Sequence, residues 1–334
     1  MNKELFEEND RNIRVFGLET QKKLFESEVL IMNITPMMSE LCKNLILSGA
    51  GICLFDNNSE IEKIDAENNF FFNLMDIKKN KVEILKEKIK SFKQNCKINI
   101  VKDINEIKSQ NMKYSVIDLS DENQNINDLR KEIEKVMNEN KGILYYVKIK
   151  EDMSIFMNNI LEQKLIDNIE KKDNSINFVK DENIIEHMDL SDDENSIETN
   201  KKENNTKKEE KLIEILNEDD EKGKEKEIIL NESDYTFLEM NEKINKIKEL
   251  IPKNIKKNEE EIILNCFELY SNGNCLIKKS PLNTLCNYII GGVVCHEIIN
   301  CISKKKNPRT NIYYYDSFKG IGKFLNELYD KNIN

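Results

Sequence analysis

The stretch SEVLIMNITPMMSELCKNLILSGAGICLFDNN, residues 27–58, constrains the fold more than any other part of the chain. Residues 29–34 form a compact apolar run suited to a buried strand, and residues 39–48 place apolar side chains on one helical face. Two glycines then favour a turn, and residues 52–55 form a second buried strand followed by Asp56. This order predicts a βαβ unit with a parallel pair of strands.

Similar apolar patterns continue along the chain. They predict further helices at residues 2–26, with a bend or break at Gly17, at 79–94, at 127–139 and from Pro281 onward. They predict further strands at residues 98–101, 115–119 and 143–149, and a core strand plus a turn in TNIYYYDSFKGIGKF, residues 310–324. Repeated alternation of strands and helices indicates an α/β fold with an open, mostly parallel sheet covered by helices.

The composition changes after about residue 160. Residues 181–226 are dominated by Glu, Asp, Asn and Lys and cannot bury enough apolar surface to offset the entropy lost on ordering. Within them, KLIEILNEDDE could add a strand to a partner's sheet, or form a transient helix, or have no role. We expect residues 1–160 and 254–334 to form two parts of one domain, separated by an acidic, largely disordered insertion at residues 161–253.

The charge balance bears on possible partners. The chain of 334 residues has 51 Lys and Arg against 62 Asp and Glu, a net charge of −11. This balance argues against nucleic acid as a partner, because proteins that bind a phosphate backbone concentrate positive charge. The apolar runs fall short of the roughly 20 residues that cross a bilayer, and the N-terminus lacks the apolar core of a secretory signal. We expect no membrane association, and a location in the nucleus and cytoplasm.

Cysteine and histidine offer few candidates for chemistry. The chain has eight cysteines and no C-x-x-C spacing, so no metal site is expected, and buried thiols in a reducing compartment are the simplest reading. Cys295 followed by His296 invites comparison with a nucleophile and its base. Adjacent side chains on a helix point about 100° apart, however, which disfavours that catalytic pair.

The turn between the first two strands lacks the glycines of a nucleotide site. Such a turn needs glycine because it must be tight and the backbone must approach the phosphates. Residues 33–38 contain none, Pro36 lacks a backbone N–H, and Met37 and Met38 would bring bulk to the place of the phosphate oxygens. Without this loop, Asp56 fits a capping or turn residue better than a ribose ligand.

Four segments together resemble the small, non-catalytic subunits of heterodimeric SUMO-activating enzymes, a branch of the ubiquitin-activating, ThiF/MoeB superfamily. They are DRNIRVFGLETQKKL (residues 10–24), VLIMNI…ELCKNLILSGAGICLFD (29–56), KKNKVEILKEKIKSF (78–92) and IIGGVVCHEIINCISKKKNPRTNIYYYDSFKGIG (289–322). The first is similar to the D-R-Q-I-R-x-x-G signature of the superfamily. The last is similar to the aromatic strand and D-x-x-K-G of the small subunit.

The resemblance implies a Rossmann-like ThiF/MoeB-type adenylation domain with a degenerate phosphate loop and a low-complexity insertion. Residues 1–160 and 254–334 would then be the two parts of a pseudo-adenylation domain. In that family a larger partner subunit binds ATP and magnesium, adenylates the C-terminal glycine of SUMO and carries the cysteine that forms the thioester. SUMO and, indirectly, the SUMO-conjugating enzyme are the further partners implied.

The resemblance also assigns roles to single residues. Arg11 would act as an arginine finger in trans to the partner's ATP site, with Arg14 in support. Without the resemblance, both fit solvated surface arginines. Asp56 and Lys81 would be vestigial cofactor-binding positions, Lys81 being solvated beside an empty loop.

Some positions depart from the motif. Asn9 stands where the family commonly has tyrosine, and Asn12 replaces the motif glutamine. The aspartate that follows the fourth strand in catalytic members could correspond to Asp121 or to Asp128. ENNFFFNLMD, residues 67–76, also has no arginine, which catalytic members carry before the third helix. These losses of catalytic residues favour a subunit that supports catalysis elsewhere.

Several functions remain open at this point. The chain could be the regulatory subunit of the related NEDD8-activating enzyme, or a degenerate Rossmann adaptor without a ligase role. A free-standing adenylyltransferase or nicotinamide oxidoreductase is disfavoured, because without glycines the backbone could not close on a pyrophosphate.

Overall fold

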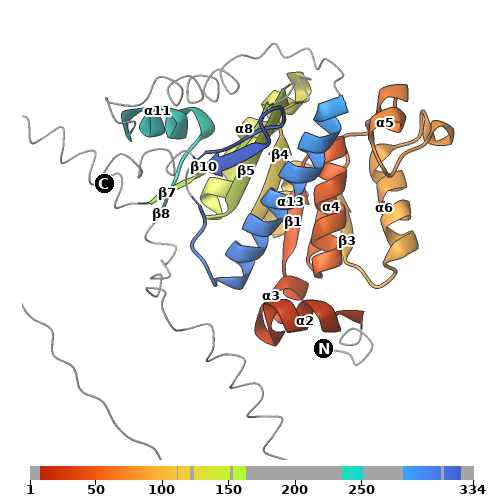
Figure 1. Ribbon diagram of the computed structural model, residues 1–334, viewed down its shortest axis with the longest axis horizontal. Helices are drawn as coiled ribbons and strands as arrows, with labels where there is room; N and C mark the ends of the chain where they lie inside the picture. Colours follow the sequence, from red (N-terminus) through yellow and green to blue (C-terminus); the bar gives the residue numbers. More distant parts are fainter. Residues whose placement is uncertain are drawn as a thin grey trace, which may run out of the picture. The chain divides into compact units, whose positions relative to one another are not determined.

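The computed structural model describes residues 8–110, 112–120, 124–150, 153–162, 235–250, 281–309 and 312–324. Its helices are α2 (Asp10–Phe16), α3 (Leu18–Glu26), α4 (Pro36–Ser48), α5 (Lys63–Asn68), η1 (Leu74–Asp76, a 3-10 turn), α6 (Lys81–Phe92), α7 (Ile104–Gln110), α8 (Gln124–Glu139), α11 (Met240–Leu250) and α13 (Pro281–Ser303). Its strands are β1 (Glu28–Ile31), β2 (Gly51–Phe55), β3 (Ile98–Val101), β4 (Tyr114–Asp118), β5 (Ile143–Lys150), β6 (Met153–Asn158), β7 (Ile160–Glu162), β8 (Tyr235–Phe237), β9 (Tyr313–Asp316) and β10 (Ile321–Phe324). Strands and helices alternate through the first half, which confirms the predicted α/β class (Figure 1).

The described residues contain an eight-stranded sheet in the order β10-β9-β6-β5-β4-β1-β2-β3. The five strands from β3 to β5 pair in parallel, and β6, β9 and β10 extend the sheet with antiparallel pairs. The predicted βαβ unit is present: β1 and β2 are parallel neighbours, with Val29 opposite Ile52. Because β9 pairs with β6, the last described strands join the same sheet as the first half of the chain.

Both faces of the parallel strands are covered by helices. Along β1, Val29 and Ile31 contribute to a core with α3, α4, α6 and α13, whereas Leu30 contributes to a second core with α7, α8 and α11. Successive side chains of a strand point to opposite faces, so a strand that is buried on both reads as a continuous apolar run. This explains why residues 29–34 lack polar alternation.

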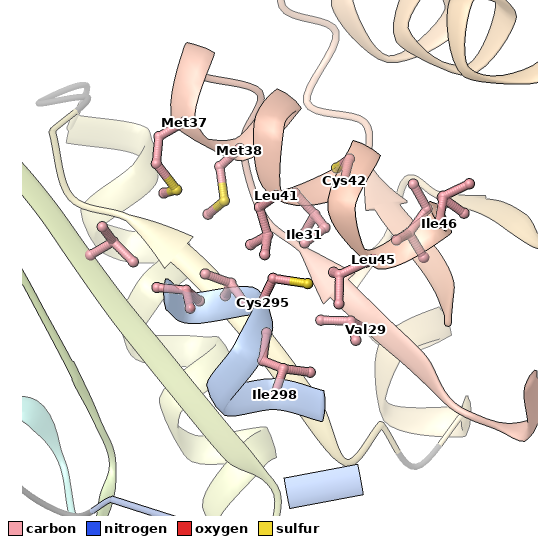
Figure 2. Packing of buried hydrophobic residues seen from close by; sticks show 14 of the residues in the cluster. Val29, Ile31, Met37, Met38, Leu41, Cys42, Leu45, Ile46, Cys295 and Ile298 are labelled. Atoms are coloured by element: carbon pink, nitrogen blue, oxygen red, sulfur yellow. The ribbon is translucent and has the colours of Figure 1, made fainter. Parts of the chain in front are cut away.

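Helices α4 and α13 lie side by side on one face of the sheet (Figure 1). Figure 2 shows Leu41 and Leu45 of α4 beside Cys295 of α13, above the strand that carries Val29 and Ile31, all of them buried. Gly291 lets the two helices approach: a Cβ added there would lie 3.2 Å from the Glu40 side chain and 3.3 Å from the Met37 carbonyl oxygen. Gly291 therefore marks close packing, and it lies with Gly292 inside one continuous helix.

The N-terminal segment forms two helices instead of one. α2 ends at Phe16, and Gly17 has a φ of 83°, a value that residues other than glycine rarely adopt. The predicted break at Gly17 is confirmed. α2 is held against the end of α4 because Asn12 donates a hydrogen bond from Nδ2 to the Leu47 carbonyl oxygen at 2.8 Å.

Part of the predicted insertion is ordered. Residues 235–250 form β8 and α11, so structure resumes before residue 254; β8 pairs with β7 in a separate two-stranded sheet. Lys243 of α11 is buried and donates hydrogen bonds to Asn158 Oδ1, at 2.8 Å, and to the Ile160 carbonyl oxygen. Burial lowers the pKa of this amine well below its usual range. Residues 163–234 and 251–253 of the predicted insertion, including KLIEILNEDDE, lie outside the described residues.

α13 corrects one expectation from the sequence. Its segment Thr284–Ser303 has a mean hydropathy of 1.5 and is long and apolar enough, by length and composition, to cross a membrane. The expectation that every apolar run is too short to cross a bilayer was therefore wrong. In the fold this helix packs on α4 and on the sheet, with 56% of its most apolar window buried, as the core helix of a folded domain does.

The adjacent glycines allow a matched test of the α4–α13 contact. We expect Gly291→Leu to lower the free energy of unfolding by about 1–3 kcal/mol, because the new side chain meets α4 backbone that cannot retreat. Gly292→Leu should leave stability equal or slightly higher, since nothing lies within 4 Å of its added Cβ and leucine is the better helix former. Urea unfolding of both variants checks this, and equal losses in the two would contradict it.

Candidate functional site

The turn that would cradle phosphate lies at the carboxyl edge of the parallel sheet, between β1 and α4. Thr35 caps α4, because its Oγ1 accepts a hydrogen bond from the Met38 N–H at 3.3 Å, and Pro36 opens the helix. A helix N-terminus attracts anions through its unpaired N–H groups. Here the Met38 N–H is already bonded to the Thr35 side chain, and Pro36 has no N–H group.

A buried carboxylate lies against this helix start. Asp118, the last residue of β4, is 1% exposed, and its Oδ2 accepts a hydrogen bond from Thr35 Oγ1 at 2.5 Å. Its Oδ1 accepts a second bond from the Ser120 N–H at 2.8 Å. A negative charge at this position interacts favourably with the helix dipole. The protein thus places its own carboxylate beside the site that would attract phosphate, and a phosphate there would add a second negative charge.

Asn33, just after β1, is hydrogen-bonded to the last residue of β4. Its Nδ2 donates to the Asp118 carbonyl oxygen at 3.1 Å, and its Oδ1 accepts from the Asp118 N–H at 3.2 Å. Both strand ends are thereby held at the same level of the sheet edge. The Asn33–Thr35–Asp118 cluster, as we call these three residues, is the part of the site that sequence reasoning missed.

The two methionines of the turn do not fill the phosphate position, which corrects the sequence expectation. Met37 and Met38 are fully buried and belong to the core beneath α4, and Figure 2 shows them among the other side chains of that core. No residue of 33–38 takes a positive φ, so the turn has no need of glycine.

The acidic candidates after the fourth strand are not part of this cluster. Asp121 lies outside the described residues, and Asp128 is exposed on α8. The carboxylate at the strand end is Asp118 itself. The sequence could have indicated Asp118, because an acidic residue at the end of a buried strand is the pattern that drew attention to Asp56 after β2.

Asp56 is occupied by internal partners. It is buried, and its Oδ1 accepts bonds from the Asn58 N–H and from Asn80 Nδ2, both at 2.9 Å. Lys102 Nζ lies 3.6 Å from the other oxygen. Asn80 in turn caps α6, so Asp56 links the end of β2 to the start of that helix. These contacts are those of a turn residue.

Lys81 is not solvated, contrary to expectation. Its side chain is 15% exposed, and Nζ lies 3.0 and 2.9 Å from the two carboxylate oxygens of Asp65. Asp65 also accepts a hydrogen bond from the Glu62 N–H and so closes the first turn of α5. Lys81 therefore joins α6 to α5.

The two candidate arginines lie on α2, far from the Asn33–Thr35–Asp118 cluster. Arg11 is exposed, and Arg14 is exposed and pairs with Asp10 at 2.9 Å. Between them, Asn12 faces α4 as described above. The two positions that depart from the motif, Asn9 and Asn12, both make contacts within the chain. Asn9 is buried, and its Oδ1 accepts a hydrogen bond from Lys93 Nζ at 3.1 Å.

The Cys295–His296 pair does not form a nucleophile and base. Cys295 is buried against α4, and burial raises the pKa of its thiol to about 12. His296 is exposed, and its ring Nδ1 lies 3.3 Å from Asn300 Nδ2 on the same helix. Partial burial and the nearby Lys306 and Arg309 lower the pKa of this imidazole. Across the part of the chain that is described, no three His, Cys, Asp or Glu side chains gather as metal ligands.

The Thr35 hydroxyl can be tested by a pair of substitutions. Thr35→Val removes the cap of α4 and the hydrogen bond that the hydroxyl donates to Asp118 Oδ2, so we expect a loss of about 1–3 kcal/mol in the free energy of unfolding. Thr35→Ser keeps the hydroxyl and should lose less than half of that. Denaturant titration of the two variants measures the difference, and identical stabilities would argue against the role of the hydroxyl.

Comparison with known proteins finds similarity over part of the chain. Residues 9–139 match the model of the ThiF family. The DNA damage tolerance protein rad31 of Schizosaccharomyces pombe is 38% identical over 81 residues, 24% of this chain and 26% of the relative. SUMO-activating enzyme subunit 1 of Dictyostelium discoideum is 36% identical over 64 residues, 19% of each chain. The NEDD8-activating enzyme E1 regulatory subunit of Danio rerio is 29% identical over 94 residues, 28% of this chain and 18% of the relative.

The matched stretches span about a quarter or less of these relatives' own lengths. Solved structures agree with the fold over much more of the chain. PaaA superimposes with a TM-score of 0.53 at 12% identity, over 97% of this chain and 83% of PaaA. E. coli MccB, crystallised with MccA, gives a TM-score of 0.52 at 12% identity, over 95% and 71%. The chain thus has a Rossmann-like α/β fold similar to that of these solved structures, and its residues 9–139 are similar to the ThiF family.

Proposed function

We propose that this chain is the non-catalytic subunit of an activating enzyme for a ubiquitin-like modifier, with SUMO as the modifier. The observation that carries the proposal is the Asn33–Thr35–Asp118 cluster, which occupies the cradle position of a ThiF-type fold with the chain's own carboxylate. ATP and magnesium are then bound by a larger homologous subunit. That subunit adenylates the modifier's terminal glycine and receives it on a cysteine as a thioester, and a conjugating enzyme then takes the modifier over.

The relatives support an activating role and leave the modifier to be decided. One is named as a SUMO-activating subunit and another as the regulatory subunit of a NEDD8-activating enzyme. The D-x-x-K-G sequence after the aromatic strand, Asp316 to Gly320, favours the SUMO branch. A NEDD8-activating role, or an adaptor on a degenerate Rossmann scaffold, is the second candidate. We further propose that the heterodimer works in the nucleus and cytoplasm.

The position of Arg11 suits action in trans. α2 contacts the C-terminal end of α4 through Asn12, whereas the cradle position is at the N-terminal end of α4. α4 has 13 residues, so these ends lie about 20 Å apart at the helical rise of 1.5 Å per residue. An arginine side chain cannot extend that far. This distance supports a role for Arg11 at a nucleotide that another subunit binds.

At a partner's site a guanidinium would spread positive charge over phosphate oxygens as the modifier's carboxylate displaces pyrophosphate. Arg11 is exposed on α2, and its neighbour Arg14 is held by Asp10. For this reason Arg11 is the primary candidate and Arg14 a supporting one.

Titration of the isolated chain with ATP and magnesium tests whether it binds the nucleotide without a partner. We expect no saturable binding at micromolar ATP by isothermal calorimetry, because the helix start is capped and carries a buried carboxylate. The reconstituted heterodimer is the positive control. Micromolar affinity in the isolated chain would contradict a purely supporting role.

Arg11→Ala should slow adenylation in the reconstituted enzyme by at least tenfold, and by about 10²–10³-fold if the guanidinium contacts the transition state directly. Arg11→Lys should restore only part of the rate, since an ammonium lacks the planar fork of donors. ATP–pyrophosphate exchange measures the rate, and gel filtration shows whether the heterodimer still forms. Lys90→Ala, an exposed basic residue on α6, serves as the control. Normal exchange in Arg11→Ala would refute the role.

The choice of modifier is decided by thioester formation with SUMO and with NEDD8, each supplied with candidate larger subunits. Charging of SUMO alone supports the proposal, and charging of NEDD8 alone favours the second candidate. If the chain binds no larger homologue with a glycine-rich loop, the adaptor reading stands.

A further inference from the structure

α2 carries Arg11 but is anchored by little apolar surface. It lies with α3 at one end of the domain, below α4 (Figure 1). All seven residues of α2 are described and none of them is buried, and Phe16 packs against the core from a partly buried position. By contrast, α4 buries nine of its thirteen residues. A helix of two turns is not stable on its own in water, so contacts other than apolar burial have to hold α2 in place.

Three hydrogen bonds, which we call the α2 bonds, join α2 to residues at the C-terminal ends of three other helices. They are donated by Asn12 Nδ2 to the Leu47 carbonyl oxygen at 2.8 Å, by Lys93 Nζ to Asn9 Oδ1 at 3.1 Å, and by Lys305 Nζ to the Phe16 carbonyl oxygen at 2.7 Å. The last carbonyl groups of a helix have no donors within it. Asn12 satisfies one such group of α4, and Lys305 satisfies one of α2.

The α2 bonds determine which face of α2 points outward. Asn9, Asn12 and Phe16 are spaced by three and four residues, so they share the face that meets the rest of the domain. Arg11 precedes Asn12 by one residue and therefore points about 100° away from that face. Arg11 and Val15, four residues later, are both exposed. The contacts that fix the rotation of α2 about its axis thus also fix the direction of the Arg11 side chain.

α3 does not fix this rotation by itself. Gln21 of α3 is buried and donates a hydrogen bond to the Ser48 carbonyl oxygen at 2.9 Å, so α3 is attached to the domain independently. The two helices are separate elements, because α2 ends at Phe16 and Gly17 turns the chain between them. The orientation of α2 therefore depends on its own contacts.

We infer that Asn12 and Lys305 are positioning residues for Arg11, with the Asn9–Lys93 bond holding the start of the same helix. The inference rests on the proposed function, in which the Arg11 guanidinium acts on a nucleotide of another subunit. A displacement of about 1 Å at a reacting centre can lower a rate by about 10²-fold. Lys305 belongs to a run of three lysines, residues 304–306, that sequence reasoning would assign to solvent.

A double variant removes the donors while keeping the bulk of the helix. Asn12→Ala introduces a good helix former, so α2 itself is not weakened, and Lys305→Met keeps the aliphatic stem and removes the amine. Lys306→Met, at an exposed neighbour, removes the same charge and is the matched control. In the isolated full chain, amide hydrogen exchange of residues 10–16 should become about threefold faster or more in the double variant and stay unchanged in the control. Unchanged exchange in the double variant would overturn the inference.

ATP–pyrophosphate exchange by the reconstituted enzyme tests the link to Arg11. The double variant should lower kcat by about fivefold or more and leave the KM for ATP unchanged, because the misplaced guanidinium acts in the transition state. Added to Arg11→Ala, the same two changes should alter kcat by less than about twofold, since no guanidinium is left to misplace. Lys305→Arg alone keeps a donor for the Phe16 carbonyl oxygen and should retain the wild-type rate.

The outcomes separate the inference from the proposed function. If the double variant slows exchange equally with and without Arg11, the α2 bonds act on stability or assembly, and the inference is overturned while the role of Arg11 stands. A normal kcat in the double variant beside a slow Arg11→Ala enzyme also overturns it. If Arg11→Ala exchanges normally, or if the wild-type chain supports no exchange with any larger subunit, the proposed function fails first and the inference fails with it.

Discussion

The hydrogen bond from the Thr35 hydroxyl to the Asp118 carboxylate governs the carboxyl edge of the sheet. It joins the start of α4 to the end of β4, while Asn33 holds β1 and β4 in register from the other side. The helix dipole, which in a nucleotide-binding fold would act on phosphate, here lies beside a carboxyl group of the protein itself. The groups at this edge of the sheet are therefore bonded to one another within the chain.

Much of the fold could be predicted because its signals are local. The apolar run at residues 29–34, the glycine after α4 and the periodicity of α6 each specify one element, and parallel pairing follows from their order. β6, β7, β8 and α11 were missed. β6 joins β5 by antiparallel pairing within a few residues, and α11 is fixed by the buried Lys243, a residue that a sequence pattern assigns to solvent.

The site was harder to predict because its contacts join distant residues. Thr35 and Asp118 are 83 positions apart, and no spacing rule connects them. Met37 and Met38 were assigned to the vacant phosphate space from their place in the turn, but the direction of a side chain at a helix start depends on the packing below it. Asp56 was placed correctly at its strand end, and Lys81 was not, since its partner Asp65 belongs to a short helix without a clear apolar pattern.

The pairing of β7 with β8 has a consequence for how this chain can vary. Leu161 lies opposite Thr236 and Glu162 opposite Tyr235, so the described residues on either side of residues 163–234 are neighbours in one small ladder. The entropy of closing a loop grows only with the logarithm of its length, and doubling the length costs about 0.6 kcal/mol. Because the two strands pair directly, the free energy of unfolding of the domain depends only weakly on how many residues lie between them. By this relation, a change in the number of residues between the two strands alters the free energy of unfolding little through loop closure.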